Sequence, residues 1–103
     1  MEVKFLSKEL KTLYQTGSSK KYKNVPLQVV RKFARAVDLL SAATKIQDIW
    51  EFPGYRFKHL EGNKMYSMRM DITWRLEMEI EWINNDCTIG IIGLDDLTKH
   101  YGD

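Results

Sequence analysis

Apolar and charged residues alternate without a break from Trp74 to Trp82. This period of two predicts a strand with one buried face and one solvent-facing face. The segment from Tyr66 to Met70 alternates in the same way, and residues 71–73 remain between the two segments as a turn. Together they predict an antiparallel hairpin.

The register of this hairpin follows from its apolar faces, because a slip of one residue would turn one strand inside out. Matching Met68 with Leu76 places Arg69 opposite Arg75. Two guanidinium groups that face each other across a ladder repel. Either Glu77 neutralises the pair, or an anion such as phosphate lies between the arginines. The pattern alone favours neutralisation, since charged residues on an exposed strand face are usually solvated.

Helical periodicity precedes the hairpin. From Leu27 to Ala42, apolar residues recur at three- and four-residue intervals, and the preceding Pro26 suits the first turn of a helix. A shorter helix is expected from Lys8 to Thr16, with Ser7 as its N-cap. One more helical turn is expected within residues 44–50, before Phe52-Pro53-Gly54 ends it.

The remaining segments predict short strands and turns. Residues 2–6 form an edge strand or lead into the first helix, and residues 55–60 and 88–94 form further strands. Residues 95–103 are expected to make a brief helical turn, and Cys87 is expected to be a small buried residue of a strand. The order of elements predicts one α+β domain over residues 1–103, with N-terminal helices packed on one face of a small antiparallel sheet.

Composition limits the class of protein. The chain has 103 residues, contains no apolar run of membrane-spanning length and lacks a signal-peptide core at its start, so we expect a cytoplasmic protein. A single cysteine excludes an internal disulfide and a cysteine-rich metal site. Residues 1–60 carry 12 Lys and Arg against 5 Asp and Glu, whereas residues 61–103 carry 4 against 9. The basic half is therefore the half suited to a polyanion.

Common catalytic motifs are absent. The two histidines, His59 and His100, lack metal-ligand spacing, so no metal or other cofactor is expected, and no glycine-rich nucleotide loop or serine elbow is present. What remains is a set of basic and titratable residues: Arg56, Lys58, His59, Arg69, Arg75, His100 and Tyr101. Such groups can cleave RNA without a metal, because a base can remove the proton of the ribose 2′-hydroxyl while cations stabilise the phosphate and an acid protonates the leaving oxygen.

Several segments resemble one bacterial family. The stretches ELKTLYQTGSSK, LSAATKIQDI, FPGYRFKHLEGN, MYSMRMDITWR and KHYGD, with the order PGxR, LxG, YSxR and WR, are similar to the HigB branch of the RelE/ParE superfamily of type II toxins. The resemblance implies a ribosome-dependent endoribonuclease that cuts mRNA in the ribosomal A site. It also implies a HigA-type antitoxin with a helix-turn-helix domain, through which alone the toxin would meet operator DNA.

The resemblance also implies roles for individual residues. Arg75, in WR, corresponds to the cation at the scissile phosphate, and Arg69, in YSxR, is a second candidate. The basic residue before the LxG turn falls on Lys58 or on His59, as a base or a phosphate contact. Under the nuclease hypothesis, further candidates for proton transfer are His100 and Tyr101, and candidates for RNA binding are Arg56, Tyr66, Lys20, Lys21 and Lys23.

The C-terminal part departs from the family pattern. Several members end the last strand with Asp-Tyr-His, whereas here Asp96 aligns only loosely and His100-Tyr101 come later in reversed order. Glu61 replaces the LxG lysine of some members. Two alternatives therefore stay open beside the nuclease: a ParE-like inhibitor of DNA gyrase, and a degenerate toxin that mainly binds its antitoxin and adjusts repression of its operon.

Overall fold

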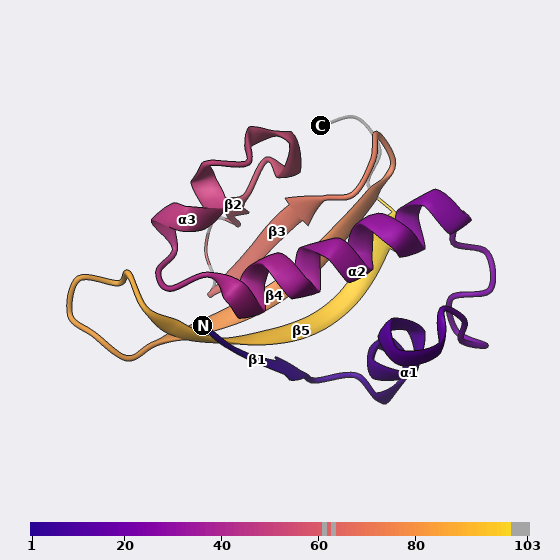
Figure 1. Ribbon diagram of the computed structural model, residues 1–103, viewed down its shortest axis with the longest axis horizontal. Helices are drawn as coiled ribbons and strands as arrows, with labels where there is room; N and C mark the ends of the chain where they lie inside the picture. The colour runs from indigo at the N-terminus through magenta and orange to yellow at the C-terminus, as the bar shows by residue number, and fades with distance from the viewer. Residues whose placement is uncertain (61, 63, 100–103) are drawn as a thin grey trace.

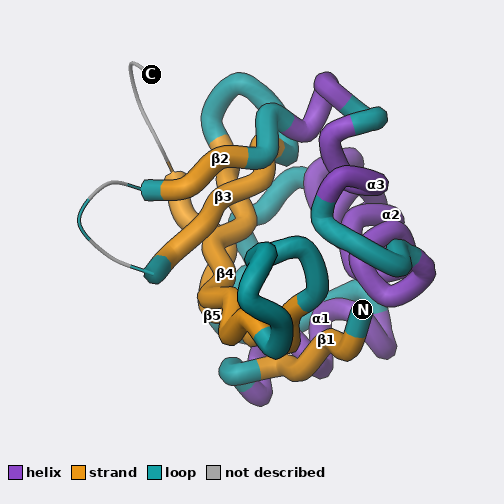
Figure 2. Tube along the Cα trace, turned by 90° about the vertical axis from the view of Figure 1, so that its left-hand side faces the viewer, coloured by secondary structure: helices purple, strands orange, loops and turns teal. Residues whose placement is uncertain are grey.

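The computed structural model describes residues 1–60, 62 and 64–99. Within these residues, three α-helices pack against a mixed sheet of five strands (Figure 1). The expected α+β architecture is confirmed. Helices α2 and α3 lie on one side of the sheet in Figure 2, and no helix of the described residues covers the opposite face, which we call the open face.

The strands follow the order β1-β5-β4-β3-β2 across the sheet. Their bounds are Glu2–Phe5 for β1, Lys58–His59 for β2, Met65–Arg69 for β3, Trp74–Trp82 for β4 and Gly90–Lys99 for β5. The expected hairpin is confirmed, with Met68 paired to Leu76 and Arg69 to Arg75. The sheet is mostly antiparallel, but β1 pairs with β5 in parallel.

The two longer helices have the bounds that periodicity predicts: Lys8–Thr16 for α1 and Leu27–Ala42 for α2. Ser7 caps α1, since its hydroxyl oxygen accepts a hydrogen bond from the backbone N–H of Leu10 at 3.2 Å. The short helix α3, Gln47–Trp50, leads through Phe52 into a 3₁₀ turn at Pro53–Tyr55. Among the described residues, no helix is long and apolar enough to cross a membrane.

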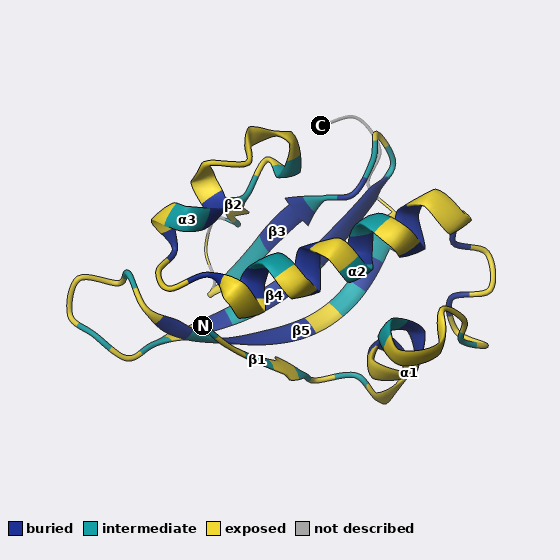
Figure 3. Cartoon of the chain, viewed as in Figure 1, coloured by how far each residue is buried: buried dark blue, intermediate teal, exposed yellow. Residues whose placement is uncertain are grey.

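The core lies between α2 and the sheet. The side of α2 that faces the sheet is buried and its outer side is exposed (Figure 3). Phe33 of α2, Leu76 and Met78 of β4, and Leu94 of β5 are all fully buried. The apolar residues of β4 meet the helices and its charged residues lie on the open face, as the alternation predicts. Arg75 departs from the expected solvent-facing position, because it is buried on that face.

The expected helical turn after Leu94 is wrong, because β5 continues to Lys99. A bulge at Glu77 and Met78 shifts the register, so that Leu94 pairs with Met78 while Asp96 pairs with Glu77. The bulge adds one residue to β5, so apolar and polar residues no longer alternate there. For this reason the sequence pattern did not predict the second half of the strand. Residues 100–103 lie outside the described residues.

Two other expectations need correction. Cys87 is not a buried strand residue; it is exposed in the turn between β4 and β5, with a left-handed φ of 55°. The side-chain oxygen of Asn84 accepts hydrogen bonds from the backbone N–H groups of Thr88 and Ile89, so β5 begins only at Gly90. The strand expected over residues 55–60 shortens to Lys58–His59, since the 3₁₀ turn occupies its beginning.

Candidate active site on the open face of the sheet

A single carbonyl oxygen joins the two facing arginines. The main-chain oxygen of Asp71 accepts a hydrogen bond from Arg69 Nε at 3.2 Å and another from Arg75 Nη1 at 2.9 Å. Arg75 Nη1 also donates to the main-chain oxygen of Trp74 at 3.3 Å. The shared acceptor draws the two cations together and offsets their repulsion.

The side chain of Asp71 builds the turn that carries this carbonyl. Its Oδ1 accepts hydrogen bonds from the backbone N–H groups of Thr73 at 2.8 Å and Trp74 at 2.7 Å. Aspartate commonly closes turns in this way. The sequence pattern predicts only that Asp71 belongs to the turn. The signal for its larger role is the presence of an aspartate between two arginines of one hairpin.

The arginines differ in exposure. Only 4% of Arg75 is exposed, whereas Arg69 is half-buried. A charged group so deeply buried needs fixed hydrogen-bond partners, and the turn carbonyls supply them. Arg69 is therefore the more accessible of the two guanidinium groups.

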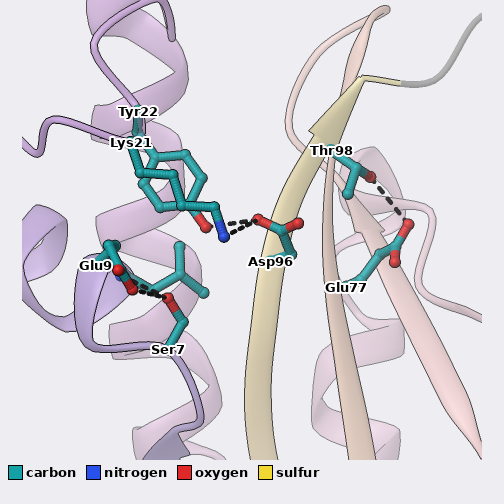
Figure 4. Close-up of polar contacts among 8 residues, drawn as sticks. Ser7, Glu9, Lys21, Tyr22, Glu77, Asp96 and Thr98 are labelled. Atoms are coloured by element: carbon teal, nitrogen blue, oxygen red, sulfur yellow. Dashed lines mark hydrogen bonds and ion pairs between the residues drawn. The ribbon is translucent and has the colours of Figure 1, made fainter.

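Glu77, the expected neutraliser, contacts the neighbouring strand. Its Oε2 accepts a hydrogen bond from the hydroxyl group of Thr98 at 2.9 Å (Figure 4). Thr98 is itself the ladder partner of Arg75. Glu77 is thus oriented by β5 next to the arginine pair.

The register of β2 separates two residues that the sequence left as alternatives. Lys58 is opposite Ser67, which lies two residues from Arg69 on the same face of β3. His59 is opposite Tyr66, and its ring stacks on the Tyr66 ring with centroids 4.7 Å apart. Lys58 therefore shares the open face with the arginines, and His59 lies on the other face of the sheet.

Tyr66 belongs to an aromatic cluster on that other face. Its ring stacks on Phe57 at 5.4 Å and meets the edge of Trp82 at 6.0 Å. The cluster lines a hollow of about 400 Å³ that also includes Trp50 of α3. Tyr66 is thus placed apart from Arg69 and Arg75.

The three lysines expected to bind RNA lie in the loop between α1 and α2. We call residues 18–25 the lysine loop. Lys20 and Lys23 are exposed beside a hollow of about 640 Å³, and Lys21 Nζ lies 3.8 Å from Asp96 Oδ1. Arg56 is exposed at the end of the 3₁₀ turn, with a left-handed φ of 44°.

Two of the expected site residues, His100 and Tyr101, lie outside the described part of the chain. In the sequence they follow Lys99, the ladder partner of Trp74. Within residues 1–60, 62 and 64–99, no group of three or more histidine, cysteine, aspartate or glutamate side chains could hold a metal ion.

Residues 3–91 match the HigB-like toxin family, described as the RelE-like toxin of the type II toxin-antitoxin system HigB. The chain belongs to this family. The toxin is 26% identical to Toxin HigB-1 of Vibrio cholerae serotype O1 over 84 residues, which cover 82% of this chain and 86% of that protein. A cognate antitoxin is therefore a partner of this toxin.

The fold of the toxin also has a structural counterpart. A YoeB/ParE toxin from Agrobacterium tumefaciens aligns with a TM-score of 0.55 at 11% sequence identity. The alignment covers 98% of this chain and all of the other. The helices and the mixed sheet are thus the fold of the RelE/ParE superfamily, as the sequence motifs predict.

Proposed function

We propose that the toxin is a ribosome-dependent endoribonuclease that cleaves mRNA in the ribosomal A site. The observation that carries this proposal is the arginine pair, Arg69 and Arg75, joined on the open face by the carbonyl oxygen of Asp71. Positive groups held in advance at the position where charge develops on a phosphate are the main source of catalysis in such reactions. Membership of the HigB-like family supports RNA as the substrate.

The proposed reaction needs no water and no metal. A base removes the proton of a ribose 2′-hydroxyl, and this oxygen attacks the adjacent phosphorus. The bond from phosphorus to the 5′-oxygen breaks, an acid protonates that oxygen, and a 2′,3′-cyclic phosphate remains. Lys58, which shares the open face with the arginines, acts as a base or a phosphate contact, and His100 and Tyr101 are the other candidates for proton transfer, whereas His59 lies on the other face of the sheet.

The exposures of the arginines suggest a division of work. Arg69 contacts the phosphate directly, because it is the more accessible guanidinium group. Arg75 lies deeper and contributes charge from a fixed position. Arg56 and the three lysines of the lysine loop hold the RNA backbone. Tyr66 lies on the other face of the sheet and takes no part in this arrangement.

The same proposal includes the partners. The antitoxin is of the HigA type with a helix-turn-helix domain, and it links the toxin to operator DNA. The ribosome presents the mRNA to the open face. The cytoplasm is where these partners meet.

Cleavage of mRNA on programmed ribosomes tests the proposal. We expect Arg75→Ala and Arg69→Ala each to reduce the cleavage rate by about 10²–10³-fold, the loss typical for one stabilising group. Arg31→Ala, which removes an exposed arginine of α2, is the matched control and should cleave normally. Thermal melting must show that each variant is folded.

The outcomes separate the alternatives. Equal cleavage by folded Arg75→Ala would remove Arg75 from the mechanism. No cleavage by the wild type, together with inhibition of gyrase supercoiling, would favour the gyrase alternative. Normal cell growth on expression without the antitoxin would favour the degenerate toxin over both.

A further inference from the structure

The second half of β5 has an edge that β1 does not cover. In the pairing of β1 with β5, Glu2 is opposite Ile91 and Phe5 is opposite Leu94. The last backbone hydrogen bond between the two segments runs from the N–H of Leu6 to the main-chain oxygen of Leu94 at 2.9 Å. An uncovered edge exposes unpaired backbone groups. Beyond Leu94, the lysine loop reaches this edge through Tyr22.

Tyr22 is the contact between the loop and the strand. Only 5% of Tyr22 is exposed, and its hydroxyl group donates a hydrogen bond to Asp96 Oδ1 at 2.5 Å. Burial and the carboxylate of Asp96 both raise the pKa of Tyr22, so its hydroxyl group keeps its proton and remains a donor.

Asp96 is shared between two groups of the lysine loop. Lys21 Nζ lies 3.8 Å from the same Oδ1 atom that accepts from Tyr22 (Figure 4). Tyr22 and Asp96 are 74 residues apart in the sequence, so this contact ties the first third of the chain to its last strand.

We propose that Asp96 is a positioning residue, whose carboxylate holds Tyr22 and Lys21 and thereby fixes the lysine loop against β5. The resemblance to the family aligns Asp96 loosely with an acid/base group instead. In this chain, the Oδ1 of Asp96 is already committed to a hydroxyl donor and an ammonium group. The proposal rests on the proposed function only in treating the lysine loop as an RNA contact.

The position of Asp96 links the loop to the arginine pair. Asp96 is opposite Glu77 in the ladder, and Thr98, two residues further, is opposite Arg75. The lysine loop is thus anchored within two residues of the strand position that faces Arg75. Its exposed Lys20 and Lys23 would extend the positive charge of the arginines along an RNA backbone.

The chain contains a matched control for this contact. The hydroxyl group of Tyr14 donates to Asp38 Oδ1, also at 2.5 Å, but this pair lies on the exposed surface between α1 and α2. Tyr22→Phe and Asp96→Ala test the anchor, and Tyr14→Phe and Asp38→Ala remove the same chemistry elsewhere. Phenylalanine keeps the packing of the ring.

Kinetics on programmed ribosomes give the first measurement. We expect Tyr22→Phe and Asp96→Ala to raise KM by about fivefold, the equivalent of one hydrogen bond, with kcat unchanged. The double variant should be no worse than the worse single variant, because both changes release the same anchor. Tyr14→Phe and Asp38→Ala should leave both constants unchanged. A fall in kcat of about 10² or more for Asp96→Ala alone, with KM unchanged, would make Asp96 a proton-transfer residue and overturn the proposal.

Hydrogen exchange of the toxin, separated from its antitoxin, gives a measurement that needs no RNA cleavage. We expect faster exchange across residues 18–25 in Tyr22→Phe and in Asp96→Ala, and no change there in Tyr14→Phe. Unchanged exchange in the first two variants would overturn the anchor whatever the cleavage assay shows. Faster exchange with a wild type that cleaves nothing would uphold the anchor and reject the nuclease.

Discussion

The β3–β4 hairpin and the second half of β5 hold their polar groups in different ways. In the hairpin, Arg69, Asp71 and Arg75 lie within seven residues, and a turn carbonyl joins them. At β5, Asp96 meets Tyr22 across 74 residues. The hairpin site therefore depends on a local turn, whereas the anchor at β5 exists only when the helices and the sheet are packed together.

The largest expected effect tests whether both regions belong to one cooperative fold. Leu76 and Leu97 are ladder partners with 0% and 4% exposure, one in the hairpin and one in the second half of β5. We expect Leu76→Ala to lower the free energy of unfolding by about 3 kcal/mol and Leu97→Ala by about 2 kcal/mol, because each leaves a cavity. Urea denaturation measures both.

Ile72→Ala at the tip of the hairpin is the control for these substitutions. Ile72 is 78% exposed, so its truncation should change the unfolding free energy by less than about 0.5 kcal/mol. A loss as small as this for Leu97→Ala would show that the end of β5 is not part of the core.

A second prediction concerns the turn of the hairpin. Asp71→Ala removes the acceptor of two backbone N–H groups, and we expect it to lower the unfolding free energy by about 1–2 kcal/mol and also to reduce cleavage, because the shared carbonyl loses its position. Asp71→Asn keeps an acceptor oxygen and should restore much of both. Urea denaturation measures the stability of each variant. The cleavage rate is measured on programmed ribosomes.

Asp48→Ala is the matched control, since Asp48 Oδ2 accepts from the backbone N–H groups of Thr44 and Lys45. It should weaken the start of α3 without affecting cleavage. Equal loss of cleavage in Asp71→Ala and Asp48→Ala would mean that the effect of Asp71 is only one of stability.

A third prediction uses the pKa of Tyr22, which burial and Asp96 raise above the ordinary value of about 10. The folded protein therefore holds this proton more tightly than the unfolded chain. The contribution of this protonated hydroxyl group to the free energy of unfolding is complete below about pH 10. Above that pH the free energy of unfolding falls, by up to about 1.4 kcal/mol per pH unit.

Urea denaturation between pH 8 and 11.5 should show this loss in the wild type and a smaller one in Tyr22→Phe. The difference isolates Tyr22 from other groups that titrate in alkali. The same slope in both proteins would contradict the raised pKa of Tyr22.

The smallest expected effect concerns the turn between β4 and β5. Because Cys87 has a left-handed φ of 55°, Cys87→Gly relieves backbone strain in the folded state. Glycine also adds chain entropy to the unfolded state, which opposes this gain, so we expect the free energy of unfolding to change by less than about 0.5 kcal/mol. Cys87→Val should cost about 1 kcal/mol, since a β-branched residue tolerates this φ poorly. Thermal melting of the two variants is the measurement, and the reverse order would indicate a buried strand residue.

Some parts of the site could be predicted from local sequence. The facing of Arg69 and Arg75 follows from alternation on two strands joined by a short turn, and the structure has this register. The carbonyl that joins them could not be predicted, because its position depends on the hydrogen bonds that the Asp71 side chain makes within the turn. The choice between the faces for Lys58 and His59 needed the pairing of β2 with β3.

The sequence by itself determined the two long helices, the β3–β4 hairpin, the facing arginines and the toxin family, because each rests on periodicity or on motifs within short segments. Tertiary structure alone decided that β1 pairs in parallel with β5, that a bulge carries β5 through to Lys99, and that Tyr22 meets Asp96. These features arise from contacts between segments distant in the chain, and no local pattern encodes which distant partner a strand edge or a carboxylate will find.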